Sequence, residues 1–310
     1  MSASNFTGRV AAFDRASTAG DLYITQVGLP NTAWWGLEHA AIVQGAAASV
    51  DGKSHCVIVE AGAHQGTLAL LASKLGCECY AFEAAPKNVL LLERNLLIND
   101  VPSKIHVIPG FVGRIGSGRI DAHVRAQQLV TLLKMDIDGM DLAAMHGASK
   151  LFNRRAVRFI NLEYSPRKQS HAGTGAEYLR QLHEWGFDVF LYSCTPKRAA
   201  ESKISAALGG GRCLTYGNYG RSLRRGGRGV WPYDEREDAR RFVRCLFRLP
   251  EPSSATSGLA AAQRVAASVA EVHTEACRAV EAPQLISPSR FEDFAAAVHE
   301  VDLVGRLRPE

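Results

Sequence analysis

Two short apolar runs, each ending in an acidic residue, flank a glycine-containing turn in the first third of the chain. Residues 56–60 lead into Gly62 and Gly66, and residues 77–83 end in Phe-Glu. β-Branched apolar runs of this length are typical of strands buried on both faces. Residues 67–75, between them, are rich in Ala and Leu and predict a helix. The pattern therefore predicts a strand, a tight turn, a helix and a second parallel strand.

This order predicts a nucleoside site, because ligands of open parallel sheets bind beyond the carboxyl ends of the strands. Glu83 is placed to accept hydrogen bonds from both ribose hydroxyls. The turn lacks G-x-G-x-x-G spacing, since His64 stands where a pyrophosphate requires bare backbone. Glu60, just before the turn, suits the ammonium of an amino-acid tail, and loop amides suit its carboxylate. The pattern favours S-adenosylmethionine over a dinucleotide; a chance glycine turn is the alternative.

Further acids follow two more apolar runs. Residues 132–141 (LLKMDIDGMD) pass from a strand into acids and a glycine, and residues 157–164 (VRFINLEY) form another strand with an acid near its end. The carboxylates at predicted strand ends are Glu60, Glu83, Asp136 and Glu163. Carboxylates gathered at one sheet edge are unfavourable unless they bind something. A cationic sulfonium is one such ligand.

These motifs resemble those of the FkbM methyltransferases. The matching stretches are EAGAHQG (60–66), FEAAP (82–86), LKMDIDGMD (133–141), Gly147-Ala148 and NLE (161–163). The resemblance covers residues 55–165, with weaker similarity to about residue 250. It implies a Rossmann-like class I methyltransferase fold, with a mostly parallel, doubly wound sheet and an antiparallel last strand. It also implies S-adenosylmethionine as cofactor and a hydroxyl group, on a sugar or polyketide for example, as acceptor.

The chain departs from the family pattern at a few positions. Glu60 replaces the usual Asp, His64 the usual Asn, and Asp138 and Asp141 the usual Glu. Acid-for-acid changes keep the charge, whereas His for Asn changes both shape and titration. These changes leave open an unusual substrate or weakened activity.

The resemblance implies a role for each matched position. The implied cofactor-binding residues are Glu60, Gly62, Ala63, Gly66, Glu83, Ala84, Asn88, Phe111 and Asp136. The acid and the small residues of the first turn would hold the methionine part, and Glu83 the ribose. Phe111, in a turn after the strand expected at 105–108, would cover adenine. Asp136 would lie between cofactor and acceptor.

Methyl transfer to an alcohol is an in-line displacement that depends on alignment of the two reactants. The alcohol must also lose its proton near the transition state. The candidate catalytic residues are Asp136 and Glu163, with His64 next because an ordinary histidine titrates near neutrality. Asp138 and Asp141 precede a helix expected at 142–151 and are equally typical of helix caps.

Composition fits a soluble, cytoplasmic enzyme. The chain has 310 residues, 46% of them hydrophobic, with no run long enough for a membrane span and no secretory signal pattern at its start. An odd count of seven scattered cysteines predicts reduced, buried thiols, among them Cys56, Cys77 and Cys79. No second pair stands at metal-binding spacing, so no metal site is predicted.

The chain divides into three expected parts: a leader or cap with a helical stretch (1–50), a methyltransferase domain (51–250) and a helical extension (251–310). Within the domain a helix is expected at 175–185 and strands at 188–194 and, antiparallel, at 244–249. Helices expected at 260–280 and 291–304 either pack back on the core or mediate self-association.

An insertion at 195–240 carries the main basic cluster, residues 221–228 (RSLRRGGR), in a chain of net charge +5. Such a cluster suits an anionic or nucleic-acid acceptor, and a solvated loop is the alternative. We expect methylation of a hydroxyl on a small molecule. The alternatives are an RNA-directed methyltransferase that uses this cluster, a noncatalytic cofactor-binding or scaffold protein and, more distantly, a nicotinamide dehydrogenase.

Overall fold

The computed structural model describes residues 6–10, 22–26, 40–50, 55–99, 105–166, 168, 174–194, 285–298 and 301–309. The basic cluster 221–228, the strand expected at 244–249 and the helix expected at 260–280 lie outside these residues.

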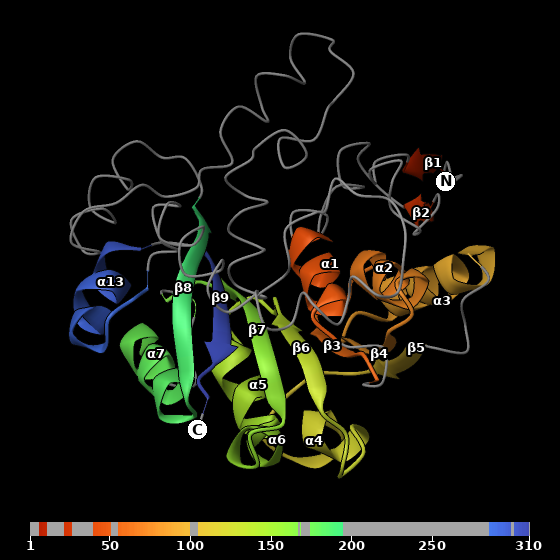
Figure 1. Ribbon diagram of the computed structural model, residues 1–310. Coiled ribbons are helices and arrows are strands. Elements are labelled where there is room, and N and C mark those ends of the chain that lie inside the picture. Colours follow the sequence, from red (N-terminus) through yellow and green to blue (C-terminus); the bar gives the residue numbers. More distant parts are fainter. Residues whose placement is uncertain are drawn as a thin grey trace, which may run out of the picture.

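A seven-stranded sheet forms the centre of the described structure (Figure 1). In spatial order its strands are β5 (Ile105–Pro109), β4 (Glu78–Glu83), β3 (Val57–Ala61), β6 (Val130–Met135), β7 (Val157–Tyr164), β9 (Val301–Leu307) and β8 (Phe187–Cys194). The first five are mutually parallel, and β9 runs antiparallel to both of its neighbours. The order reverses between β3 and β6, as in doubly wound sheets. This topology confirms the expected Rossmann-like, mostly parallel and doubly wound sheet with an antiparallel last strand.

Helices cover both faces of the sheet (Figure 1). One face carries α1 (Ala40–Ala48), α2 (Thr67–Lys74) and α3 (Pro86–Asn99). The other carries α4 (Ile120–His123), α5 (Asp141–Gly147), α6 (Ser149–Asn153), α7 (Gly175–Glu184) and α13 (Phe291–Ala297). Short 3-10 turns lie at Gly116–Gly118 and Pro288–Arg290, and β1 (Phe6–Val10) pairs antiparallel with β2 (Leu22–Gln26) outside the main sheet. No described helix has the combination of length and apolarity that crossing a membrane requires.

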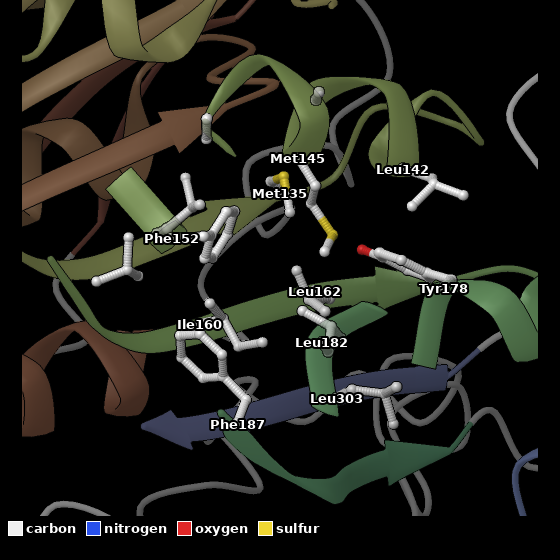
Figure 2. Close-up of a cluster of buried hydrophobic side chains, with 14 of the residues drawn as sticks. Met135, Leu142, Met145, Phe152, Ile160, Leu162, Tyr178, Leu182, Phe187 and Leu303 are labelled. Carbon is white, nitrogen blue, oxygen red and sulfur yellow. The ribbon is translucent and has the colours of Figure 1, made fainter. Parts of the chain in front are cut away.

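The larger core lies between the sheet and the helices α5 to α7 (Figure 2). Met135 and Leu162 from neighbouring strands are buried against Met145 and Leu182 from the helices. Burial of a side chain of this size contributes roughly 1.5–3 kcal/mol. Because the central strands are covered on both faces, they are nearly continuous apolar runs, as the sequence predicts.

The C-terminal region departs from expectation. The helix expected at 291–304 ends at Ala297, and Val298 is already extended, with φ −93° and ψ 139°. The chain then forms β9 between β7 and β8. Leu303 faces one core and Val304 the other. A strand buried on both faces carries apolar residues at consecutive positions, which also satisfies a helical pattern.

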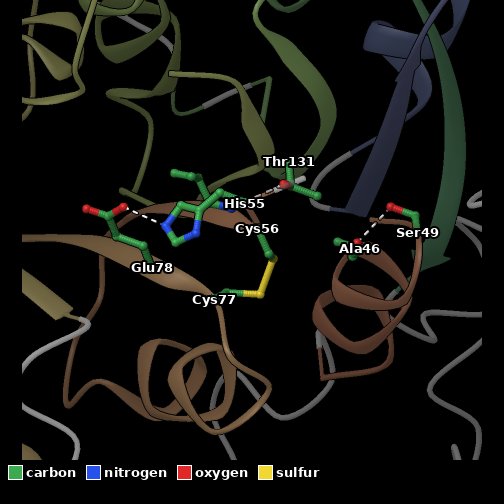
Figure 3. The surroundings of a disulfide bond; sticks show 8 residues. Ala46, Ser49, His55, Cys56, Cys77, Glu78 and Thr131 are labelled. Atoms are coloured by element: carbon green, nitrogen blue, oxygen red, sulfur yellow. Dashed lines mark hydrogen bonds and ion pairs between the residues drawn. A yellow bond between two sulfur atoms is a disulfide. The ribbon is translucent and has the colours of Figure 1, made fainter. Parts of the chain in front are cut away.

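Cys56 and Cys77 form a disulfide, contrary to the expected reduced thiols (Figure 3). Val57 and Glu78, the first residues of β3 and β4, pair in register. The two cysteines directly precede these residues and therefore lie opposite each other, with their Cα atoms 4.6 Å apart. The scattered positions along the sequence gave no sign of this pairing. Cys79 is buried and free, as expected. The cytoplasmic setting rested partly on reduced thiols and stays a prediction, since disulfides persist mainly in oxidising compartments.

We expect reduction of this disulfide to lower the free energy of unfolding by about 3 kcal/mol, because it frees a loop of about 20 residues in the unfolded chain. Urea unfolding with and without a reductant measures the difference. The double variant Cys56→Ala/Cys77→Ala serves as the control, since it should not respond to the reductant. An equal response of both proteins would contradict the assignment.

Glu78, at the start of β4, is the centre of a polar cluster at the amino ends of the strands. Its carboxylate oxygens lie 2.9 Å from His55 Nε2 and 2.8 Å from His106 Nε2. The hydroxyl of Tyr80 and the guanidinium of Arg125 donate to it at 3.1 and 3.2 Å. Burial raises the pKa of Glu78, but the hydrogen bonds and the charge of Arg125 outweigh burial and hold the pKa at about 2.

The lowered pKa predicts a specific acid sensitivity. A carboxyl whose pKa is lower in the folded than in the unfolded state stabilises the fold above pH 4.5, and that contribution disappears as the pH falls towards 2. We expect Glu78→Gln to be less stable than the wild type at pH 7 and to lose less stability between pH 4.5 and 2. Urea midpoints measured across this range would disprove the role of Glu78 if both proteins gave parallel curves.

Candidate functional site

The four carboxylates that the sequence predicts at strand ends lie on four neighbouring parallel strands. Glu60 is the penultimate residue of β3 and Glu83 the last of β4, whereas Asp136 directly follows β6 and Glu163 precedes the last residue of β7. The strands are adjacent in the order β4, β3, β6, β7. The carboxyl end of the sheet is therefore acidic at its centre, where the strand order reverses.

The turn after β3 fits closely against the end of β6. Gly62 has φ +82°, and a Cβ at this position would lie 2.0 Å from the carbonyl oxygen of Asp136. Gly66, also at φ +82°, occupies the N-cap position of α2 and leaves no room for a Cβ beside Leu92. Both glycines are thus required by the protein's own packing.

The backbone amides of this turn are engaged within the protein. The N–H groups of Gly62 and Ala63 both donate to the carbonyl of Phe82, at 3.0 and 2.9 Å, and the N–H of Gly66 donates to Ala63 at 2.7 Å. In this arrangement they do not supply the carboxylate contacts that the sequence suggested. Helix α2 begins at Thr67 without a side-chain cap, so the dipole at its first turn suits a carboxylate better.

Glu83 is held in one orientation by three donors. Its Oε2 accepts from the backbone N–H of His64 at 2.7 Å, and its Oε1 accepts from the N–H of Ala85 at 2.8 Å and from Asn88 Nδ2 at 3.2 Å. A carboxylate has about four acceptor positions, so about one position remains for a ribose hydroxyl. Asn88, which the sequence assigns to the adenosine, orients Glu83 in this structure.

The turn that follows β5 lies beside Glu83. The N–H of Gly110 donates to the carbonyl of Glu83 at 2.9 Å, and the next side chain, Phe111, is 80% exposed. An exposed aromatic ring next to Glu83, the acid expected to bind the ribose, is consistent with the expected cover for adenine. Ala84 is partly exposed at the same edge. Both adenine-side roles stay predictions.

Glu60 forms a buried ion pair with Lys134. The two residues pair in register on β3 and β6, and Lys134 Nζ lies 3.9 Å from Glu60 Oε1 and 3.3 Å from Asp136 Oδ2. Burial raises the pKa of Glu60 to about 7, although the charge of Lys134 and the backbone amide of Ala69 oppose the shift. The negative charges of Asp136 and Glu83 add to it. Sequence reasoning assigned no role to Lys134; its signal was a lysine inside an otherwise apolar, buried strand.

A second lysine joins the acids at the tips of β6 and β7. Lys168 Nζ lies 3.1 Å from Asp138 Oδ1 and 3.3 Å from Glu163 Oε1, and Ser165 Oγ donates to the same oxygen of Glu163 at 3.2 Å. A Cβ on Gly139 would lie 2.4 Å from the carbonyl oxygen of Lys168, so this segment lies directly over the turn after β6. The sequence did not indicate Lys168, because its contacts come from a chain reversal after β7.

The helix-cap interpretation holds for neither acid in its simple form. Asp138 is 87% exposed on its side chain, has φ +53° and pairs with Lys168, whereas the N-cap position of α5 is Met140. Asp141 is the first residue of α5 and accepts a hydrogen bond from the N–H of Gly139 at 3.2 Å. Its buried carboxylate therefore closes the turn before the helix.

His64 lies in the turn with φ +50°. Burial lowers the pKa of its imidazole, although the negative charge of Glu83 opposes that shift. The ring is therefore neutral at pH 7 and able to accept a proton. His64 remains a candidate base behind the carboxylates.

Comparison with known proteins supports a methyltransferase. Residues 114–189 match the family described as "Methyltransferase FkbM domain". This stretch contains the acids after β6 and β7 but not the turn after β3 or the end of β4. The family match confirms the resemblance that the sequence suggested. No curated protein matches the chain.

Several solved structures have a similar fold. A precorrin-6y C5,15-methyltransferase from Geobacter metallireducens has a TM-score of 0.35 at 13% identity, over 48% of this chain and 73% of that one. An rRNA methylase from Streptococcus thermophilus has a TM-score of 0.37 at 15% identity, with coverages of 49% and 84%. The METTL16 MTase domain has a TM-score of 0.40 at 15% identity, with coverages of 54% and 67%. These scores are low, so the fold assignment rests on the sheet topology.

The family implies S-adenosylmethionine as cofactor, and the residues at the sheet edge fit it. Glu60 Oε2 is buried without a hydrogen-bond partner among the described residues, which suits the ammonium of the methionine part. Glu83 presents an oriented carboxylate at the position expected for the ribose.

We expect Glu83→Ala to raise the Kd for S-adenosylmethionine by about 100-fold, because a hydrogen bond from the ribose to a charged group is lost. Asn88→Ala is the matched comparison and should cost about 10-fold, since the amide orients Glu83 with a single hydrogen bond. Isothermal titration calorimetry measures both values, with NAD as a ligand that should not bind. An unchanged affinity in Glu83→Ala would remove the ribose assignment.

Proposed function

Because residues 114–189 match the FkbM methyltransferase domain, we propose that this chain transfers the methyl group of S-adenosylmethionine to a hydroxyl oxygen of a small molecule. The methyltransferase family and the cofactor follow from that match. The hydroxyl acceptor is supported by the carboxylates at the mouth of the site, since an alcohol needs a base and a more nucleophilic amine or thiol often does not.

The observation that carries this proposal is the pair of carboxylates on adjacent strand tips. Met135 pairs in register with Leu162, so the next residues, Asp136 and Glu163, lie at the same level of β6 and β7. Their side chains are 34% and 20% exposed, which makes both reachable from solvent. Asp136 also adjoins the turn after β3, through the close approach of Gly62. A carboxylate here lies between the expected cofactor position and the solvent from which an acceptor enters.

Each residue of the site then has a part in the transfer. When bound, S-adenosylmethionine supplies an electrophilic methyl group on a positively charged sulfur. Asp136 takes the proton of the acceptor hydroxyl, and Lys134 fixes the orientation of that carboxylate through the contact at 3.3 Å. Lys168 and Ser165 hold Glu163, which orients the acceptor from the side of β7. Alignment of this kind supplies much of the rate enhancement in a displacement.

The charge at the mouth favours an uncharged acceptor. Among the described residues, the tips of β6 and β7 carry Asp136, Asp138 and Glu163 against two lysines, Lys134 and Lys168. The phosphodiester backbone of RNA binds protein surfaces that carry an excess of positive charge. A neutral hydroxylated compound, such as a sugar or a polyketide, fits this edge better than RNA does. The basic cluster on which the RNA alternative rested lies outside the described residues.

We expect Asp136→Asn to reduce methyl transfer by about 100- to 10,000-fold while the affinity for S-adenosylmethionine changes by only a few fold. The assay follows transfer of a labelled methyl group from the cofactor to a panel of hydroxylated small molecules. Glu93→Gln, on the exposed surface of α3, is the matched control and should transfer normally. Full transfer by Asp136→Asn would exclude this residue as the base. Cofactor binding by the wild type without transfer to any hydroxyl compound would instead favour the noncatalytic alternative.

A further inference from the structure

Three buried polar side chains form a row across the middle of the sheet, one level below the strand tips. Glu60 on β3 pairs in register with Lys134 on β6, which pairs in register with Asn161 on β7. Each stands two residues after an apolar side chain that packs in the core beneath α1 and α2, so all three point to that face. All three are buried.

The row contains more acceptors than its described donors satisfy. Asn161 uses its Nδ2 to donate to the carbonyl of Leu303 at 3.2 Å, and its Oδ1 has no hydrogen-bond partner among the described residues. Glu60 Oε2 is likewise buried without a hydrogen-bond partner among the described residues. Buried oxygens of this kind are normally satisfied, so a protonated group or a bound cation is expected beside them.

Lys134 does not neutralise Glu60 fully. Its Nζ lies closer to Asp136 than to Glu60, at 3.3 against 3.9 Å, so its charge is shared between two carboxylates. The other ionisable groups that act on Glu60 are carboxylates, Asp136 after β6 and Glu83 on β4.

The remaining ionisable neighbours bring no further positive charge. Cys79 on β4 is a buried thiol whose pKa is raised by burial and by Glu60, so it is uncharged. His64 in the turn is neutral, because burial lowers its pKa. Helix α1, on the same face, has no acidic residue in its first turn and no basic residue in its last. Among the described residues and without ligand, Glu60 therefore has one partial counter-ion, Lys134, and two like charges.

We propose that the ammonium of the cofactor's amino-acid tail displaces a proton from Glu60, and that Lys134 is the positioning residue that holds this carboxyl ready for the exchange. The inference rests on the proposed function and adds a proton to the binding reaction. The O–H bond of the Glu60 carboxyl breaks and its proton passes to the buffer, while the ammonium takes over the negative charge. The net charge of the site is then the same before and after.

The pKa of Glu60 near 7 sets the pH range in which this exchange is visible. Below that pH the ligand-free site carries the proton, so binding releases close to one proton at pH 6. By about pH 7.5 Glu60 has lost most of its proton, and the small remaining release is offset by proton uptake on the cofactor's own α-amino group, whose ordinary pKa is about 8. The affinity for S-adenosylmethionine should therefore rise with pH up to about 7 and then level off.

Calorimetry of the full chain with S-adenosylmethionine in phosphate and in imidazole buffers tests the proposal, because both buffer at these pH values and differ in ionisation enthalpy. We expect the apparent heats to differ at pH 6 in proportion to about one released proton and to converge by about pH 7.5. S-Adenosylhomocysteine carries the same ammonium but no sulfonium, so its binding should release the same number of protons. Release with S-adenosylmethionine alone would overturn the assignment to the ammonium.

Variants distinguish the proton release from the other contributions to binding. Glu60→Gln should abolish the buffer dependence of the binding heat. Glu83→Gln should weaken binding but leave the buffer dependence unchanged. Lys134→Met should move the midpoint of the proton release to higher pH, because loss of the positive charge raises the pKa of Glu60. Lys134→Arg should return the midpoint to its wild-type pH. A purely structural lysine would change affinity or stability without moving the pH midpoint.

The ligand-free wild type provides a second measurement that does not depend on any variant folding. A carboxyl whose pKa is higher in the folded than in the unfolded state binds its proton more tightly when folded. The free energy of unfolding should therefore fall as the pH rises from 4.5 to about 7. S-Adenosylmethionine should remove most of that fall.

The outcomes distinguish the inference from the function on which it rests. Tight binding of S-adenosylmethionine with equal heats in both buffers from pH 6 to about 7.5 would overturn the proton exchange and leave the methyltransferase proposal standing. Absence of binding at every pH would overturn both.

Discussion

The contact between the turn after β3 and the end of β6 determines the geometry of the whole site. Gly62 lies so close to the Asp136 carbonyl that any side chain would separate the two strands. The N–H of Asp136 also donates to the carbonyl of Ala61 at 3.1 Å, which extends the ladder to this point. Because the strands are fixed here, the cofactor acid on β3 and the proposed base after β6 have one relative position. The order reversal in the sheet places both residues where ligands of doubly wound sheets bind.

Within this frame, the acidic groups are stabilised by partners that local sequence does not show. Lys134 contacts acids on its own strand and on the next, and Lys168 joins residues that lie on different loops. A buried ion pair contributes little net stability, since desolvation offsets much of the attraction. The ion pairs of this site are therefore better explained by the binding of a cationic ligand than by stability. The site is therefore understandable as an arrangement of charge that is incomplete without its cofactor.

The sequence predicted the central α/β units well and the long-range contacts poorly, for physical reasons. Runs such as 57–61 and 130–135 are apolar on both faces, and this pattern is characteristic of a central parallel strand. The order of acids along the chain was enough to place four carboxylates at one edge. Residues 301–307 mix apolar residues with Asp302 and Arg306, a pattern that fits a helix equally well, and the Cys56–Cys77 bond depends on strand register. Lys168 reaches the site only through a chain reversal, so its role also required the structure.

The insertion of β9 between β7 and β8 has a consequence for the order of folding. Among the described strands, β8 meets the main sheet only through β9, which lies more than 100 residues further along the chain. During synthesis, β3 to β7 can therefore assemble early, whereas β8 must wait at the margin until β9 has left the ribosome. Pairings of such large sequence separation form slowly. The nascent chain thus passes through a stage in which β7 is an unpaired edge strand, and a chaperone would be of most use at that stage.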